Sequence, residues 1–244
     1  MAAGSFFRAV REGPELSAVA VIFDLDGVLA DSEPVHLAAE RATLADYGFD
    51  FTEDDKLEFV GRSNAEIITG LISRYGLAVE PAVLADHKAG YLRDLLPAMK
   101  GFAATTDLVG RLRDAGVPIA VASGSTPQNI VTSLAVVGLL DAFEIRVSAD
   151  EVPAGKPAPD VFLEAAARLG VRAEDCVVVE DAVPGVLAAR AAGMRCVAIP
   201  TITDPLDPAF SSAGLLFPRG MASVDVDAVM EFITAGRAQV PAPA

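Results

Sequence analysis

Five short apolar runs, set among segments with helical spacing, limit the folds open to this chain more than any other sequence feature. The runs are rich in β-branched residues and cover residues 19–23, 118–123, 145–147, 176–181 and 195–199. Helices are predicted around the later runs, over residues 104–115, 127–138, 158–169 and 184–192. Strands that alternate with helices pair in parallel, and helices then cover both faces of the sheet. The sequence therefore predicts an α/β fold with a Rossmann-like parallel sheet core.

A long helical stretch separates the first predicted strand from the other four. It is predicted to form four amphipathic helices, over residues 34–47, 53–59, 64–75 and 80–95. Because the first strand belongs to the sheet, this stretch is predicted to be an inserted small all-helical cap domain, hinged near Pro34 and Pro97–Gly101. The predicted division is a disordered leader over 1–16, a core over 17–33 and 100–238, a cap over 34–99 and a frayed tail over 240–244.

Polar residues follow the predicted strands at the points where the strands end. Asp24 and Asp26 follow the first strand, and the alternation of side chains along a strand lets both point the same way. The other residues of this kind are Ser123, Ser125, Glu180 and Asp181, and Lys156 lies in a loop before a helix. Ligands of open parallel sheets bind beyond the carboxyl ends of the strands. We therefore expect these side chains to meet at one rim of the sheet.

The charges at this predicted rim do not balance. The rim has one ammonium group, that of Lys156, and four carboxylates, those of Asp24, Asp26, Glu180 and Asp181. Carboxylates placed close together repel one another and raise a pKa strongly. A divalent cation relieves this repulsion, and ligands that are all oxygen favour Mg²⁺, which keeps several waters and shares its coordination with a phosphate. The sequence therefore predicts a magnesium site.

The order of these motifs resembles that of the haloacid dehalogenase-like hydrolase superfamily, over nearly the whole chain. The shared elements are Asp24-Leu25-Asp26-Gly27-Val28-Leu29, then Ser123 after an apolar strand, then Lys156, and then Glu180-Asp181. The helical insertion after the first strand is similar to the first cap type of that superfamily. The subgroup that the chain resembles most contains sugar-phosphate phosphatases and β-phosphoglucomutase.

The resemblance implies a role for each residue at the rim. Asp24 would be the nucleophile that forms an aspartyl-phosphate, and Asp26 would be the general acid and base. Lys156 would neutralise charge on the phosphate and on Asp24. The implied phosphate-binding residues are Gly27, Ser123 and Gly124. The implied magnesium ligands are Asp24, the backbone carbonyl of Asp26, Asp181 and Glu180.

Local structural roles are also expected for some of these positions. Thr126 and Pro127 have the residue types of a helix cap and a first helical position. Glu180 and Asp181 could cap the helix predicted over 184–192, and Gly27 could be a plain turn glycine. These roles are compatible with function, because helix N-termini also bind anions.

The predicted cap contributes further candidate residues. His36 lies twelve residues beyond Asp24, a position that resembles the cap-facing histidine of the family. Arg62 lies between two cap helices, where this family places its substrate-selecting loop, and it could bind a second anionic group. His87, Lys88 and Tyr91 could line the inner face of the cap. The alternative for each of these residues is an ordinary surface or core position.

The favoured function is a Mg²⁺-dependent phosphatase that hydrolyses a small phosphorylated metabolite such as a sugar or polyol phosphate. The alternative is a β-phosphoglucomutase-like phosphosugar mutase, and a third is a non-catalytic binding protein on the same fold. The resemblance implies a Ser-Lys-Asn run in β-phosphoglucomutase where this chain has Ser125-Thr126-Pro127. The loss of that lysine and asparagine favours the phosphatase. Dehalogenases of this family lack the second aspartate, which is present here as Asp26. A phosphonate hydrolase would need a Schiff-base lysine from the cap, where only Lys56 and Lys88 precede Lys100.

Composition limits the partners that we expect. The formal net charge of −15 argues against binding to nucleic acid or to an anionic membrane surface. No apolar stretch approaches the ~18 residues of a membrane span, and residues 1–16 do not resemble a secretory signal. Cys176 and Cys196 are predicted to be reduced core thiols of a cytoplasmic protein, with a disulfide or a reactive thiol as the alternative. The oligomeric state is open, with a monomer favoured.

Overall fold

The computed structural model describes residues 19–59 and 64–235. The strands are β1 (Ala20–Phe23), β2 (Ala30–Asp31), β3 (Lys100–Gly101), β4 (Ile119–Ser123), β5 (Ile145–Ser148), β6 (Cys176–Glu180), β7 (Arg195–Ala198) and β8 (Leu215–Leu216). The helices are α1 (Glu33–Ala45), α2 (Glu53–Leu57), α3 (Asn64–Tyr75), α4 (Pro81–Leu95), α5 (Ala103–Asp114), α6 (Pro127–Val136), α7 (Asp160–Leu169), α8 (Val183–Ala191) and α9 (Val226–Thr234). Short 3₁₀ turns are Leu96–Ala98, Leu140–Ala142, Ala149–Glu151, Ala173–Asp175, Pro208–Ser212 and Met221–Ser223. The predicted leader over 1–16, the tail over 240–244 and Arg62 lie outside the described residues.

Six parallel strands form the main sheet, in the order β5-β4-β1-β6-β7-β8. β1 lies inside the sheet, where Phe23 pairs with Val121 of β4 on one side and with Val179 of β6 on the other. The chain builds one half of the sheet outward from β1 through β4 and β5, and the other half through β6, β7 and β8. The winding therefore reverses beside β1, and ligands of open α/β sheets bind at such a reversal.

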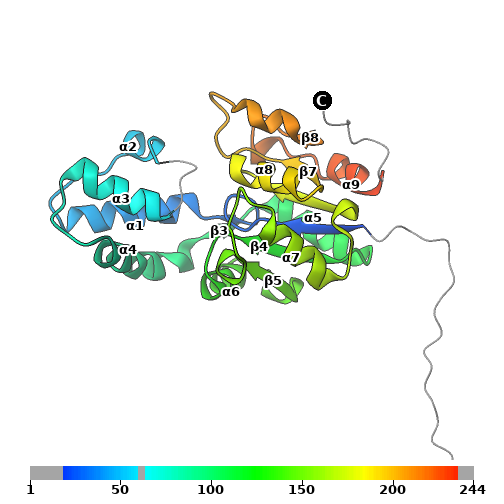
Figure 1. Cartoon of the computed structure of the whole chain (residues 1–244), viewed down its shortest axis with the longest axis horizontal. Helices are drawn as coiled ribbons and strands as arrows, with labels where there is room; N and C mark the ends of the chain where they lie inside the picture. The colour runs from blue at the N-terminus through cyan, green and yellow to red at the C-terminus, as the bar shows by residue number, and fades with distance from the viewer. Residues whose placement is uncertain (1–18, 60–63, 236–244) are drawn as a thin grey trace, which may run out of the picture.

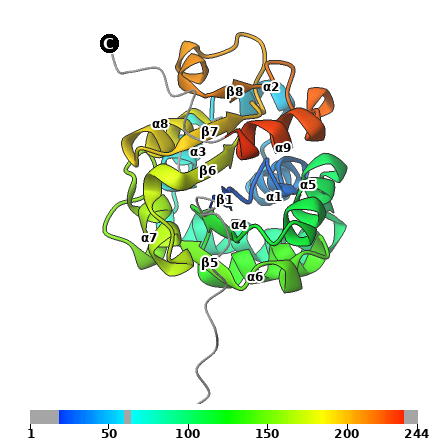
Figure 2. The ribbon, with the colours of Figure 1, turned by 90° about the vertical axis from the view of Figure 1, so that its right-hand side faces the viewer.

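Alternation along β1 divides the interior into two layers of side chains. Val21 and Phe23 pack with residues of α5, α6 and α9, whereas Ala20 and Ile22 pack with residues of α7 and α8. Figure 2 shows α7 and α8 on one face of the strands and α5 and α9 on the other. All four of these β1 residues are fully buried, as expected for a parallel strand covered on both faces. The α/β prediction is confirmed.

The helices α1 to α4 form a separate block to one side of the sheet (Figure 1). This block has its own apolar core, which includes Leu44, Phe51, Leu71 and Leu84. The chain leaves and re-enters the sheet region through a short antiparallel ribbon, in which Ala30 of β2 pairs with Gly101 of β3. The entry and the exit of the helical block therefore lie side by side.

The sequence pattern located most elements to within a few residues. The five predicted strands correspond to β1, β4, β5, β6 and β7, and the eight predicted helices correspond to α1 to α8. The two-residue strands β2, β3 and β8 were not predicted, because two residues show no periodicity. The helix α9 was also missed, although Asp225 caps it by accepting the N–H groups of Asp227 and Ala228. Within 19–59 and 64–235, no helix has the length and apolarity needed to cross a bilayer.

Candidate active site

The end of β1 turns sharply and holds Asp24 beneath the surface. The backbone N–H of Asp24 donates to the carbonyl of Val179 at 2.9 Å, which continues the pairing of β1 with β6. The chain then reverses, because the N–H groups of Leu29 and Ala30 both donate to the carbonyl of Leu25 at 2.9 Å. Asp24 is only 6% exposed, so its carboxylate is shielded from bulk water.

Lys156 joins two carboxylates from neighbouring strands. Its ammonium forms an ion pair with Asp24 at the end of β1, and it donates to Oε1 of Glu180 at the end of β6 at 2.7 Å. The ammonium also lies 4.9 Å from the centre of the Phe162 ring on α7, a cation–π contact. The sequence prediction that Asp24, Lys156 and Glu180 meet at the carboxyl ends of the strands agrees with this arrangement.

Glu180 also organises the backbone that follows β6. Its Oε2 accepts the N–H groups of Asp181 and Ala182, both at 2.8 Å, so both carboxylate oxygens have partners. A Cβ on Gly185 would collide with the Glu180 carboxylate, so a residue without a side chain is needed there. Glu180 is 1% exposed and holds Lys156 and the loop before α8 in fixed positions.

Asp181 approaches the turn after β1 from the other side. Its Oδ2 accepts the hydroxyl of Thr201, and a Cβ on Gly27 would collide with the same oxygen. Gly27 also has φ of 81°, which L side chains rarely adopt, so two independent constraints select glycine here. The absence of a side chain at Gly27 lets the Asp181 carboxylate come close to the Asp24–Asp26 turn.

The loop after β4 reaches Asp26. The hydroxyl of Ser125 donates to Oδ2 of Asp26 at 2.9 Å, and the N–H of Ser125 donates to Oγ of Ser123 at 3.0 Å. Ser148, at the end of β5, donates its hydroxyl to the carbonyl of Ser125 at 2.7 Å. The loop is therefore fixed by contacts from two strand ends. Gly124, between the two serines, is exposed and has open space around it.

Burial and charge repulsion act together on the acids at this rim. Burial raises the pKa of Asp24 to about 7, and Glu180 and Asp26 add to the effect, while Lys156 opposes it. Burial also raises the pKa of Asp181 well above its ordinary value, with the charges of Glu180 and Asp24 adding to it. For Lys156, burial works to lower the pKa, but Asp24 and Glu180 outweigh it and the pKa lies above its usual range. The lysine therefore stays charged, and the rim has an excess of negative charge.

The donor set suits a cation that needs few protein ligands. No three His, Cys, Asp or Glu side chains within residues 19–59 and 64–235 already converge as a preformed metal cluster. Mg²⁺ is usually bound through one or two carboxylates, waters and a substrate phosphate, so it does not need such a cluster. The free energy cost of keeping Asp24 and Asp181 ionised together would fall with a dication between them. The rim residues therefore fit Mg²⁺.

The structure also brings together three cap residues whose association was not predicted. Glu40 of α1 is fully buried and accepts from Lys56 of α2 at 2.9 and 3.1 Å and from Lys88 of α4 at 2.8 Å. Burial works to raise the pKa of Glu40, but the two lysines outweigh it and the pKa is lowered. We refer to Glu40, Lys56 and Lys88 as the cap cluster. A sequence signal exists, because Glu40 lies four residues after His36 and so shares its helix face.

The candidate residues His36, His87 and Tyr91 lie outside the cap cluster. His36 is half-buried, and burial lowers its pKa; the charge of Asp26 raises it, while Lys88 and Lys56 lower it. His36 therefore lies within the electrostatic reach of both the rim and the cap cluster. His87 and Tyr91 bind Oδ2 of Asp46, at 2.9 and 2.7 Å, and so have partners within the cap.

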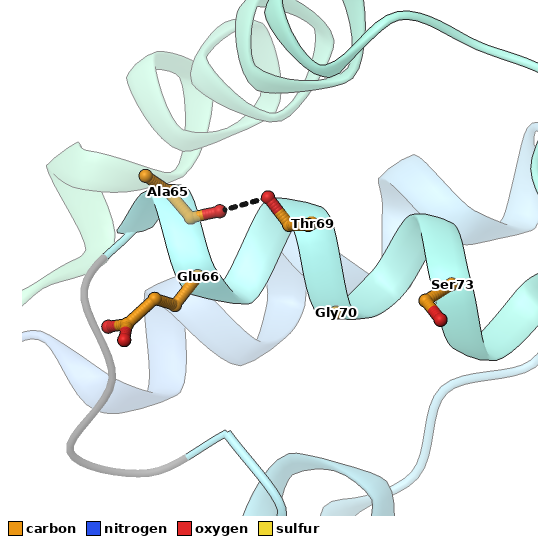
Figure 3. Close-up of a pocket in the computed structure, with 5 residues that line it drawn as sticks. All are labelled: Ala65, Glu66, Thr69, Gly70 and Ser73. Atoms are coloured by element: carbon orange, nitrogen blue, oxygen red, sulfur yellow. Dashed lines mark hydrogen bonds between the residues drawn. The ribbon is translucent and has the colours of Figure 1, made fainter.

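A shallow hollow of about 470 Å³ lies along α3 (Figure 3). The described residues that line it are Ala65, Glu66, Thr69, Gly70 and Ser73. The hydroxyl of Thr69 donates to the carbonyl of Ala65 at 2.8 Å, as the dashed line in Figure 3 shows. None of these residues belongs to the predicted site, so the hollow is a feature of the cap surface rather than of the rim.

Comparisons with known proteins agree with this geometry. The chain is 34% identical over 183 residues to the bifunctional riboflavin kinase/FMN phosphatase of Arabidopsis thaliana, covering 75% of this chain but only 48% of that protein. It is 37% identical over 177 residues to the fructose-1-phosphate phosphatase YqaB of Escherichia coli (strain K12), covering 72% of this chain and 94% of that one. A mutant of CbbY from Rhodobacter sphaeroides in complex with xylulose-(1,5)bisphosphate superposes with a TM-score of 0.73 at 25% identity, covering 84% of this chain and 95% of that one.

A match to a family model identifies the protein family of this chain. The model described as haloacid dehalogenase-like hydrolase matches residues 21–199, from β1 to just beyond β7. The matched segment contains Asp24, Ser123, Lys156 and Asp181, the residues on which the sequence resemblance depended. The chain belongs to the haloacid dehalogenase-like hydrolase family.

Proposed function

We propose that this protein is a Mg²⁺-dependent phosphatase that releases inorganic phosphate from a small phosphorylated metabolite, a sugar or polyol phosphate. The observation that carries the proposal is the ion pair of Lys156 with Asp24 and Glu180 where the winding of the sheet reverses. The likeness to a fructose-1-phosphate phosphatase, nearly all of which this chain covers, supports the substrate class.

We propose that the residues at the rim carry out the reaction in two chemical steps. In the first, a carboxylate oxygen of Asp24 attacks phosphorus, and Asp26 gives its proton to the departing alkoxide as the ester bond breaks. In the second, Asp26 takes a proton from water, which attacks the aspartyl-phosphate, releases inorganic phosphate and restores the carboxylate of Asp24. Phosphoryl transfer depends mainly on positioning and charge neutralisation.

The remaining residues would bind and orient the phosphate. Ser123 is 1% exposed and its oxygen accepts from the N–H of Ser125, which leaves its proton available for a phosphoryl oxygen. Lys156 would neutralise charge on the same group. We propose that Asp24, Asp181 and the carbonyl of Asp26 hold Mg²⁺, which would supply positive charge to the phosphoryl oxygens. Both oxygens of Glu180 already have partners, which supports a role behind Lys156 rather than direct ligation.

The structure around Ser125 favours hydrolysis over a mutase reaction. Thr126 accepts the N–H of Asn129 at 3.3 Å, and Pro127 is the first residue of α6. These two residues therefore act as a helix cap and a helix start, in the positions where the mutase resemblance would require a lysine and an asparagine. Neither position therefore offers the long lysine or the amide side chain that the mutase resemblance would require.

We further propose that residues 34–99 act as a cap over the core of 17–33 and 100–238, with the β2–β3 ribbon as the hinge. Closure would exclude bulk water while Asp24 is phosphorylated, and opening would admit the hydrolytic water. We also propose a cytoplasmic location, which the two buried free thiols of Cys176 and Cys196 support.

The test is phosphate release from a panel of sugar and polyol phosphates, measured with Mg²⁺ and with EDTA. We expect release that requires the metal. Formation of an isomeric sugar phosphate without free phosphate would identify a mutase instead. Binding of the esters without any turnover would identify a non-catalytic protein.

A further inference from the structure

We infer that Thr201 determines which cation the rim selects, because its hydroxyl engages one oxygen of Asp181 and leaves the other oxygen for the ion. The consequence is a preference for Mg²⁺ over the larger Ca²⁺. The inference rests on the proposed function and deepens it, since it concerns how the same site chooses its cation. Thr201 was not among the residues that the sequence pattern singled out.

The loop after β7 carries Thr201 alongside the loop after β6. The N–H of Ile199 donates to the carbonyl of Glu180 at 2.7 Å. Two residues later, the N–H of Thr201 donates to the carbonyl of Asp181 at 3.3 Å. These bonds continue the parallel pairing of β6 with β7, in which Glu180 is opposite Ala198. The Thr201 side chain therefore reaches Asp181 from a backbone that is itself attached to that residue.

The two oxygens of the Asp181 carboxylate have different surroundings. Oδ2 accepts the hydroxyl of Thr201. A Cβ on Gly27 would lie 2.1 Å from this Oδ2 and 3.0 Å from Oγ1 of Thr201, so the hydrogen bond is packed directly against the turn that follows Asp24. One oxygen is thus held between Thr201 and the turn. Oδ1 is the oxygen that is left to bind a cation.

A single available oxygen suits Mg²⁺ better than Ca²⁺. Mg²⁺ requires nearly octahedral coordination with oxygens at about 2.0–2.1 Å, whereas Ca²⁺ accepts about six to eight oxygens at about 2.3–2.6 Å and often takes both oxygens of one carboxylate. Both oxygens of Glu180 are already engaged by Lys156 and by backbone N–H groups, which leaves Asp181 as the acid after β6 that could offer two oxygens. A cation that needs only Oδ1 leaves the Thr201 hydrogen bond intact. A cation that needs both oxygens must break it.

The position of Thr201 allows substitutions that do not disturb the core. Thr201 is exposed, and Thr201→Val replaces its hydroxyl by a methyl group of similar size, which frees Oδ2 of Asp181. Thr201→Ser keeps a hydroxyl at the same position. The matched control is Thr69→Val on α3, at an exposed threonine whose hydroxyl donates to the carbonyl of Ala65 at 2.8 Å.

The measurement is the unfolding temperature of each protein at pH 8 over a series of MgCl₂ and of CaCl₂ concentrations, which gives the half-saturating concentration of each ion. We expect the native protein, Thr201→Ser and Thr69→Val to bind Mg²⁺ at lower concentrations than Ca²⁺. In Thr201→Val, the ratio of the Ca²⁺ to the Mg²⁺ half-saturating concentration should fall by about tenfold, because the competing hydrogen bond is lost. A purely structural role of Thr201 would lower the unfolding temperature by the same amount at every ion concentration and leave the ratio unchanged.

The inference is overturned if the native protein binds Ca²⁺ as readily as Mg²⁺, or if Thr201→Val keeps the native ratio. It is also overturned if neither ion raises the unfolding temperature of the native protein, a result that removes the magnesium site of the proposed function as well. If the ratio falls in Thr201→Val while no ester is hydrolysed, the selection of the cation by Thr201 stands and the phosphatase proposal alone fails.

Discussion

Two buried ion clusters of opposite composition lie in the two parts of this molecule. In the core, Lys156 lies between the carboxylates of Asp24 and Glu180. In the cap, the carboxylate of Glu40 lies between Lys56 and Lys88. The core cluster has more carboxylates than ammonium groups, whereas in the cap Glu33 also pairs with Lys56 at 3.3 Å, so two carboxylates match the two lysines.

The two clusters differ in how completely their charges are paired. A buried ion pair gives little net stability, because desolvation of the charges offsets their attraction. The charges of the cap cluster are paired within the cap and connect α1, α2 and α4. The core cluster keeps more carboxylates than ammonium groups, and under the proposed function Mg²⁺ and the substrate phosphate would complete it.

The largest effect is expected from the core cluster, on Asp24→Asn. The amide is a far weaker nucleophile than the carboxylate, and loss of a nucleophile lowers kcat on the order of 10⁴-fold or more. The measurement is steady-state phosphate release from the preferred ester. The matched control is Asp114→Asn at the exposed end of α5, which should keep full activity. Near-normal turnover by Asp24→Asn, with Asp114→Asn also active, would remove Asp24 as the nucleophile.

The comparison predicts opposite ion dependence when the central residue of each cluster is replaced. Lys156→Met leaves two buried carboxylates and Glu40→Gln leaves two buried ammonium groups, so each should lower the free energy of unfolding by about 3–5 kcal/mol. Mg²⁺ should restore part of the loss in Lys156→Met, and sulfate should restore part of it in Glu40→Gln. Urea unfolding with each ion gives the measurement. Recovery of both variants by the same ion would contradict the prediction that the two substitutions leave unpaired charges of opposite sign.

Magnesium binding to the native protein should weaken as the pH falls. The pKa of Asp24 is raised to about 7, so its carboxyl takes up a proton between pH 8 and pH 6 and then no longer binds a cation. Fluorimetric unfolding at several Mg²⁺ concentrations should show that the half-saturating concentration rises about tenfold from pH 8 to pH 6. An equal Mg²⁺ requirement at the two pH values would show that Asp24 does not titrate in this range.

The core cluster could be predicted from the sequence, whereas the cap cluster could not. Asp24, Ser123 and Glu180 each follow an apolar run, and parallel pairing brings the ends of such runs to one edge. That topological rule needs no knowledge of side-chain packing. Lys156 was expected at the same rim because its loop leads from a short strand into a helix, and the family resemblance then implied its role.

The cap cluster depends on how helices pack, which a local pattern does not show. Glu40 lies 16 residues from Lys56 and 48 residues from Lys88, on three different helices. A glutamate within an amphipathic helix would normally be assigned to the solvent face, because acidic residues are rarely fully buried. The spacing of Glu40 and His36 indicated a shared face but did not show which helices cover it. The helix α9 is a different case, because its Asp225 cap and the spacing of Val229 and Ile233 were readable in the sequence but were not used.

The smallest predicted effect concerns a contact beside the core cluster rather than within it. Ser125 donates to Oδ2 of Asp26 at 2.9 Å, so Ser125→Ala removes a hydrogen bond that orients this carboxylate. Loss of one such bond should lower kcat about 3- to 10-fold, with little change in KM, because Asp26 acts in the chemical step and not in binding. Ser125→Thr keeps the hydroxyl and should recover most of the activity. An unchanged kcat in Ser125→Ala would show that the orientation of Asp26 does not limit the rate, and the functional importance of the rim would then lie in the charged cluster alone.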